Sequence, residues 1–185
     1  MKFKKKPHVC LFPCPVVLIT CLDSNGNSNI ITLAWVGTVC SEPPMVALGI
    51  RPSRYSSELI EKSREFVVNI PTTKIIKETD YCGITSGRDV DKFSETQLTP
   101  EKAEKVLAPL IRECPVNMEC ILKDRVPLGT HDLFIGEVVQ VHVDQRIMDE
   151  KGNINIEIAD PITYNQGEYW NLNKKLGTYG YSKQH

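Results

Sequence analysis

The sequence has no apolar run long enough to cross a membrane as a helix. Its longest apolar stretches cover residues 16–19 and 45–50, whereas a bilayer-spanning helix needs roughly 20 residues. The basic start, residues 1–6, also lacks the apolar region and the small-residue cleavage site of a signal peptide. We therefore expect no membrane association, a cytoplasmic location, and a solvated basic tail over residues 1–8.

The sequence also lacks an excess of charge of one sign. Its 22 Lys and Arg oppose 23 Asp and Glu, which leaves a net charge of −1. Because nucleic-acid binders usually carry a basic excess, this balance favours no nucleic-acid partner. The content of 41% apolar and 24% charged residues is that of a globular protein. Without internal repeats, linkers or low-complexity stretches, the chain is expected to form a single domain over residues 9–185.

The cysteines do not follow the spacing of a metal site or of a disulfide framework. There are seven of them, an odd number, and no group of them matches a zinc ribbon. We expect mostly reduced thiols and no metal. The cysteines are Cys10, Cys14, Cys21, Cys40, Cys82, Cys114 and Cys120.

Runs of apolar and β-branched residues, separated by turn residues, predict a mainly β protein. The turn at residues 23–27 predicts a hairpin, and the change of apolar phase at Gly136 predicts a β-bulge. Seven or more strands with short inserted helices indicate a closed β-barrel. The expected strands cover residues 15–22, 29–41, 45–50, 66–70, 116–126, 133–143 and 154–158.

Three short helices are expected between these strands. Ser53 is the predicted N-cap of the first helix, and residues 73–79 form the second. Thr99 and Pro100 have the residue types of a helix start, followed by a buried stripe of Ala103, Val106 and Leu107.

Two further segments have distinctive composition. The polar residues 86–99 form the only long irregular connection and are a candidate functional loop. Residues 164–181 hold four of the six tyrosines together with Trp170, which predicts an aromatic tail that lies over a surface. Tyr169 and Trp170 are expected to stack on a ligand or simply to dock this tail.

Residues 51–57 have the composition of an anion site. Two arginines and three serines surround an expected helix start, where free N–H groups and the positive end of the helix dipole favour a phosphate. No Walker or dinucleotide glycine pattern is present. The alternative is a capped helix with two solvated arginines.

Several motifs, in this order, carry a resemblance to a known family. Residues 15–20, 29–41, the Pro-Pro turn at 43–44 and residues 51–57 resemble the flavin reductase-like family, and most closely its flavoredoxin-like branch. The resemblance continues through the Ser-Gly loop that ends in Lys-Phe, the histidine-bearing strand and the C-terminal aromatic segment, and covers roughly residues 9–182. It implies a split β-barrel of Greek-key type that binds FMN as a homodimer.

The resemblance also implies the roles of particular residues. The isoalloxazine ring would lie against Thr32, Leu33, Ala34, Trp35 and Thr38. The phosphate would be held by Arg51, Ser53, Arg54 and Ser56, with Lys92 close to the phosphate or the ring.

His131 stands where reductases of the family contact nicotinamide, but Gly129-Thr130-His131 replaces the Gly-Asp-His of many of them. His8, His142 and His185 do not lie in such a motif and are expected to have no role in the site. Cys40 and Cys82, the thiols expected nearest the ring, are interpreted as small packing residues, and redox exchange with the flavin is the alternative.

The implied function is an FMN-dependent oxidoreductase. It would move electrons from NAD(P)H through FMN to free flavin, ferric iron or a protein, with no side chain needed as acid or base. Two alternatives remain. One is a flavoredoxin-type electron carrier between proteins, without nicotinamide turnover. The other is a barrel that binds a flavin or another phosphorylated ligand without redox use.

Overall fold

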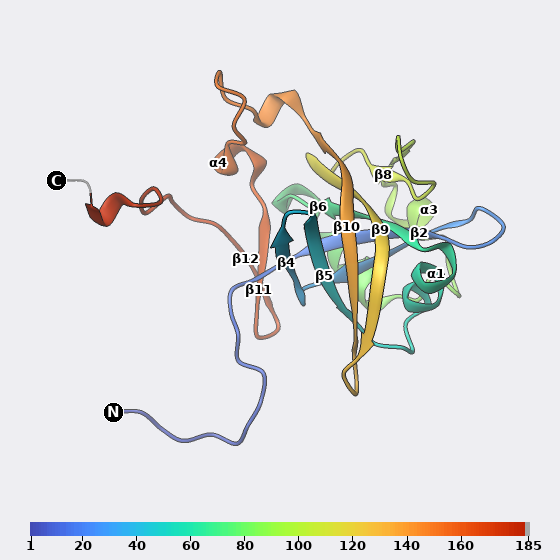
Figure 1. The fold of residues 1–185 in the computed structure, drawn as a ribbon, viewed down its shortest axis with the longest axis horizontal. Coiled ribbons are helices and arrows are strands. Elements are labelled where there is room, and N and C mark those ends of the chain that lie inside the picture. The colour runs from blue at the N-terminus through green and yellow to red at the C-terminus, as the bar shows by residue number, and fades with distance from the viewer. Residues whose placement is uncertain (184–185) are drawn as a thin grey trace.

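The computed structural model describes residues 1–183, so His185 lies outside the described residues. Its largest element is a seven-stranded antiparallel sheet that curls around an apolar core (Figure 1). The strand order is β3-β2-β6-β9-β10-β5-β4. The strands are β2 Val17–Leu22, β3 Ser28–Leu33, β4 Val36–Ser41, β5 Pro44–Ile50, β6 Glu65–Ile70, β9 Val116–Pro127 and β10 Asp132–Val143.

The two edge strands of this sheet, β3 and β4, follow one another in the chain. Only Ala34 and Trp35 separate them, and the Trp35 carbonyl accepts a hydrogen bond from the N–H of Gly49 in β5 at 2.8 Å. The prediction of a single strand over residues 29–41 is therefore wrong, because its first half pairs with β2 and its second half with β5. The sheet opens at this point, and the expected mainly β split barrel is confirmed.

The expected β-bulge in β10 is present. The pairing of β10 with β9 shifts register between Ile135 and Gly136. A Cβ atom at Gly136 would lie 2.4 Å from Cζ of the fully buried Phe66. Glycine at this position therefore lets the bulge pack directly against the aromatic core.

Short helices cover the barrel, and none of those between residues 1 and 183 is long and apolar enough to span a bilayer. Helix α3 interrupts residues 86–99, which were expected to be irregular throughout. The helices are α1 Tyr55–Ser63, η1 Thr73–Ile75, α2 Ile76–Ile84, α3 Lys92–Thr96, η2 Gln145–Ile147, α4 Ile156–Ala159 and η3 Tyr181–Lys183.

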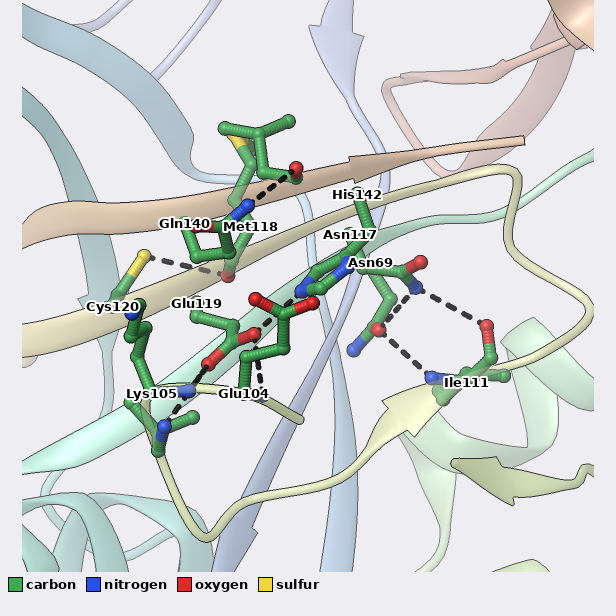
Figure 2. A network of polar contacts seen from close by, with 12 residues as sticks. Asn69, Glu104, Lys105, Ile111, Asn117, Met118, Glu119, Cys120, Gln140 and His142 are labelled. Atoms are coloured by element: carbon green, nitrogen blue, oxygen red, sulfur yellow. Dashed lines mark hydrogen bonds and ion pairs between the residues drawn. The ribbon is translucent and has the colours of Figure 1, made fainter. Parts of the chain in front are cut away.

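The predicted helix after Thr99 does not form. The chain instead makes β7 Pro100–Glu101, which pairs with β8 Leu110–Ile111, and an irregular loop between them. The Glu119 carboxylate accepts the N–H groups of residues 104, 105 and 106 at 2.6–3.0 Å (Figure 2). This contact is made from the distant strand β9, and Leu107 of the expected buried stripe is 80% exposed.

The predicted strand over residues 154–158 is also wrong. Residues 156–159 form α4, and the Asn155 side chain accepts the N–H groups of Glu157 and Ile158 as its N-cap. The alternating isoleucines of this segment are all exposed. The alternation therefore marks no buried strand face.

A small second sheet stands beside the barrel. It consists of β1 Cys14–Pro15, β11 Ile162–Asn165 and β12 Glu168–Asn171, in the order β1-β11-β12. The aromatic tail thus begins as a hairpin. Residues 1–12 and 172–183 extend away from the barrel beyond this hairpin (Figure 1).

Candidate functional site

A cavity of about 400 Å³ lies where the barrel opens between β3 and β4. Its walls come from the end of β3, the end of β5, helix α2 and the β11–β12 hairpin. It therefore brings together four of the five residues expected beside a ring, namely Thr32, Leu33, Ala34 and Trp35. The other lining residues are Val16, Ile31, Gly49, Arg51, Arg54, Asp80, Gly83, Ile84, His131, Tyr164, Gly167 and Tyr169.

A narrower cavity of about 190 Å³ lies at the start of α1 and shares lining residues with the first. Both are lined by Ile31, Arg54 and Gly83, so the two form one elongated site. We call them the wide cavity and the narrow cavity. The narrow cavity is lined by Asn29, Ile31, Ser53, Arg54, Tyr55, Ser56, Gly83, Thr85, Ser86, Gly87 and Lys92.

Lys92 places a buried cation at the narrow cavity. The residue is 3% exposed, and its Nζ donates to the carbonyls of Ile30 at 2.6 Å and Cys82 at 2.7 Å. Burial, with Arg54 nearby, lowers the pKa of this amine. Within residues 1–183 no carboxylate forms an ion pair with it. Since a buried charge is costly without a counter-charge, this environment favours a bound anion.

The first turn of α1 adds further donors to the narrow cavity. The prediction that Ser53 caps this helix is wrong: Arg54 occupies the N-cap position, and no side chain caps the helix. The first N–H groups of a helix and the positive end of its dipole attract anions. Ser53, Arg54 and Ser56 thus face the same small volume as Lys92.

Asn29 closes the narrow cavity on the side of β3. Its Nδ2 donates to Ser56 Oγ at 2.7 Å, while its buried Oδ1 has no hydrogen-bond partner within residues 1–183. A 180° rotation of the amide would exchange the two atoms and turn donors toward the cavity. A Cβ atom at Gly87 would lie 1.9 Å from Oδ1, so the loop after α2 approaches this wall as closely as only glycine allows.

Two glycines and a threonine shape the wide cavity. A Cβ atom at Gly49 would lie 3.3 Å from Cβ of Trp35, and one at Gly83 would lie 3.2 Å from Cβ of Thr32. The Thr32 hydroxyl donates to the carbonyl of Thr79 in α2 at 2.5 Å. This hydroxyl therefore anchors the helix to β3, and the small residues leave room for a flat group against the strand.

His131 and Arg51 lie at the wide cavity. The His131 ring is 4.4 Å from the Trp35 ring, centroid to centroid, and its Nδ1 is 3.1 Å from Thr130 Oγ1. Burial and the charge of Arg51 lower the pKa of His131, with Asp132 opposing them. The imidazole is therefore neutral at pH 7. Arg51, which was expected at a phosphate, does not line the narrow cavity.

Asp80 and Tyr169 form a pair that the sequence analysis did not assign together. Tyr169 Oη donates to Asp80 Oδ1 at 3.0 Å across the wide cavity. Burial and then this bond raise the pKa of Tyr169 to about 12. The aromatic tail pointed to Tyr169, but no local pattern in the sequence marks Asp80, which is brought to the site by helix α2.

The remaining candidates lie elsewhere. Thr38 is an exposed residue of β4 and lines neither cavity. The half-exposed Cys40 and the exposed Trp170 also line neither of these two cavities. Cys82 is fully buried, and burial raises the pKa of its thiol to about 11. Its thiol is therefore protonated at neutral pH, in agreement with a packing role.

Comparisons with known proteins cover nearly the whole chain. Residues 9–173, which include every residue lining the two cavities, match the family described as flavin reductase like domain. A protein of Archaeoglobus fulgidus is 35% identical over 149 residues, which are 80% of this chain and 83% of that protein. The flavoredoxin of Desulfovibrio vulgaris (Miyazaki F) is 30% identical with a TM-score of 0.93, covering 99% of this chain and 100% of that one. Flavoredoxin from Methanosarcina acetivorans is 30% identical with a TM-score of 0.89, covering 96% and 95%.

Proposed function

Because the chain belongs to the flavin reductase-like family, we propose that it is an FMN-binding oxidoreductase. In this proposal it takes electrons from NAD(P)H and passes them to an acceptor, which is free flavin, ferric iron or a protein. The observation that carries the proposal is the buried Lys92 ammonium, which lies beside an uncapped helix start and has two carbonyl partners but no carboxylate partner in the part of the chain that the structure describes. A flavin that bears a phosphate supplies the missing anion.

FMN fits the two parts of the site. The phosphate would lie in the narrow cavity, held by Ser53, Arg54, Ser56 and Lys92. Phosphate oxygens accept hydrogen bonds from hydroxyl groups and from cationic side chains such as these. The wide cavity would take the ring against residues 32–35. Bound FMN supplies the hydride and electron chemistry, while the protein binds it, orients it and limits its contact with water.

His131, Trp35 and Arg51 form the part of the wide cavity where nicotinamide is proposed to approach. The neutral imidazole offers one donor and one acceptor to an amide group, and the tilted indole offers a flat apolar face. Arg51 adds a fixed positive charge outside the narrow cavity. These groups suit a ligand that combines an aromatic amide with phosphates.

A homodimer in the cytoplasm is part of the proposal. Apolar side chains on the segment that extends from the barrel are left exposed, including Leu172 at 50% and Leu176 at 85%. Exposed apolar surface of this kind is typical of protein interfaces. We propose that a second copy of the chain covers it.

An anaerobic visible spectrum of FMN-loaded protein tests the hydride step. Addition of NADH, and then of NADPH to a fresh sample, should bleach the oxidised flavin bands with at least one of the two. A spectrum that stays oxidised until dithionite is added would overturn the nicotinamide half of the proposal.

The second candidate function is an electron carrier between proteins. It is favoured by the similarity to a flavoredoxin over the full length of both chains and by Thr130 in place of the aspartate of many reductases. In that case chemically reduced holoprotein should pass electrons to an oxidised one-electron protein such as cytochrome c faster than to free flavin. The reverse order of rates would argue against the carrier.

A further inference from the structure

We propose that Asp80 lowers the reduction potential of the bound flavin by placing one negative charge at the wide cavity. This inference rests on the proposed flavin site. In the described part of the chain, Asp80 is the only carboxylate that lines the wide or the narrow cavity, and the other charged side chains there are Arg51, Arg54 and Lys92. Cationic side chains suit a phosphate-bearing ligand, whereas a carboxylate repels it. Binding of the phosphate therefore does not explain Asp80.

The charge of Asp80 is not neutralised by an ion pair. No salt bridge within residues 1–183 includes this carboxylate, and the hydroxyl of Tyr169 donates a hydrogen bond to its Oδ1 at 3.0 Å. Burial and then this bond raise the pKa of Tyr169 to about 12, so the hydroxyl keeps its proton at neutral pH. The pair of side chains therefore brings one net negative charge to the wide cavity.

Contacts on both sides fix the position of this charge. Thr79, the neighbour of Asp80 in α2, accepts a hydrogen bond through its carbonyl from the hydroxyl of Thr32 in β3 at 2.5 Å. In the β11–β12 hairpin, the ring of Tyr169 packs edge-on against that of Tyr164, with 5.7 Å between the centroids. The carboxylate is thus held between the strand end proposed to contact the ring and the hairpin. A fixed charge beside apolar walls acts more strongly than a charge in water.

Reduction changes the charge of a flavin ring. A hydride brings two electrons and one proton to the neutral oxidised ring, which becomes an anion unless a second proton follows from water. The Asp80 carboxylate opposes this gain of negative charge and so lowers the reduction potential. Its repulsion of the phosphate is the same in both oxidation states and cancels in the potential. A lower potential makes the reduced flavin a stronger electron donor to its acceptor.

Two substitutions separate the charge of Asp80 from its hydrogen bond, and anaerobic titration of FMN-loaded protein against a dye of known potential measures both. Asp80→Asn removes the charge but keeps an amide oxygen that accepts from Tyr169. It should raise the ratio of the reduced-flavin affinity to the oxidised-flavin affinity by about tenfold, which is about 30 mV for a two-electron couple. Tyr169→Phe removes the donor but keeps the charge, and should lower the potential because the hydroxyl dipole no longer offsets the carboxylate.

Glu78→Gln is the matched control, because it removes a carboxylate from the same helix at a residue that lines neither cavity. It should leave the potential at the wild-type value. A potential that Asp80→Asn leaves unchanged or lowers, or that Asp80→Asn and Tyr169→Phe shift in the same direction, would overturn the inference. If Tyr169→Phe does not retain FMN, the comparison of Asp80→Asn with Glu78→Gln decides alone. If the wild type binds no flavin, the proposed function itself fails.

Discussion

At the scale of single residues, the structure places the two arginines differently. Arg54 lines both the wide and the narrow cavity, whereas Arg51 lines only the wide one. Arg54→Ala should therefore weaken FMN by about 10- to 100-fold, the loss of charge-assisted hydrogen bonds, and riboflavin much less. Arg51→Ala should change the two affinities by similar factors. Flavin fluorescence titration measures both, and a phosphate-selective loss for Arg51 instead of Arg54 would contradict the assignment.

In the proposed function, His131 belongs to the electron-donor side of the site. It contacts Trp35 and lines the wide cavity but not the narrow one. His131→Ala should slow reduction of the bound flavin by NADH or NADPH in stopped-flow experiments and leave the FMN dissociation constant unchanged. Thr130→Ala, which removes the hydroxyl beside Nδ1, is a milder comparison. An unchanged reduction rate for His131→Ala would remove this residue from the mechanism.

The candidate residues that the fold brings together are those with neighbouring motifs. Residues 32–35 and Lys92 were found through their order along the chain, and the fold brings them to one elongated site. Asp80 and Asn29 could not be found in this way. Their roles depend on the packing of α2 and of the Gly87 loop against β3, which are contacts between distant parts of the chain.

At the scale of elements, one buried carboxylate determines the shape of the loop between β7 and β8. Burial alone would raise the pKa of Glu119, but hydrogen bonds from residues 104–106 and from His142 outweigh burial and lower it (Figure 2). His142 was expected to have no role, but its Nε2 lies 2.5 Å from Oε1 of this carboxylate. The native state therefore prefers the ionised form of Glu119.

Glu119→Gln should lower the free energy of unfolding by about 2–3 kcal/mol at neutral pH, because charged hydrogen bonds are lost. A pKa lowered by folding stabilises the protein above the ordinary pKa near 4.5, and this stabilisation is lost as the pH falls through the native value. The difference between wild type and variant should shrink as the pH falls below that ordinary value. Urea unfolding at neutral pH and at a pH below 4.5 measures this difference in stability. A difference that does not depend on pH would argue against an ionised Glu119.

The bulge in β10 gives a second prediction about an element. Gly136→Ala would place Cβ 2.4 Å from Phe66 and should cost about 1–3 kcal/mol through overpacking. Gly37→Ala is the control, since a Cβ atom there meets nothing within 4 Å. Thermal unfolding should separate the two variants clearly. Equal stability would show that β10 adjusts its register freely.

The elements that local patterns predicted well are the long strands. The β2–β3 hairpin, β6, β9 and β10 lie where alternation and turn residues placed them. The predicted helix after Thr99 and the strand over 154–158 failed for different reasons. Glu119, which lies 13 to 15 residues from the N–H groups it binds, takes the place of helical carbonyls. Asn155 caps a helical turn that the isoleucine alternation concealed.

At the scale of the whole molecule, the split in the barrel creates the site. Strands β3 and β4 diverge at Ala34 and Trp35, and α2, the start of α1 and the β11–β12 hairpin complete the walls. The sequence predicted the barrel and one candidate anion site. It did not separate the narrow cavity from the wide cavity, because that division depends on where the start of α1 and the Gly87 loop meet.

The central claim is that the buried Lys92 ammonium and its neighbours hold the phosphate of a flavin. The measurement that tests it most directly is the affinity of the wild-type apoprotein and of Lys92→Met for FMN and for riboflavin. We expect the wild type to bind FMN at least about 100-fold more tightly than riboflavin, and Lys92→Met to remove most of this preference while riboflavin binding is retained. Equal affinity of the wild type for the two flavins would contradict the claim.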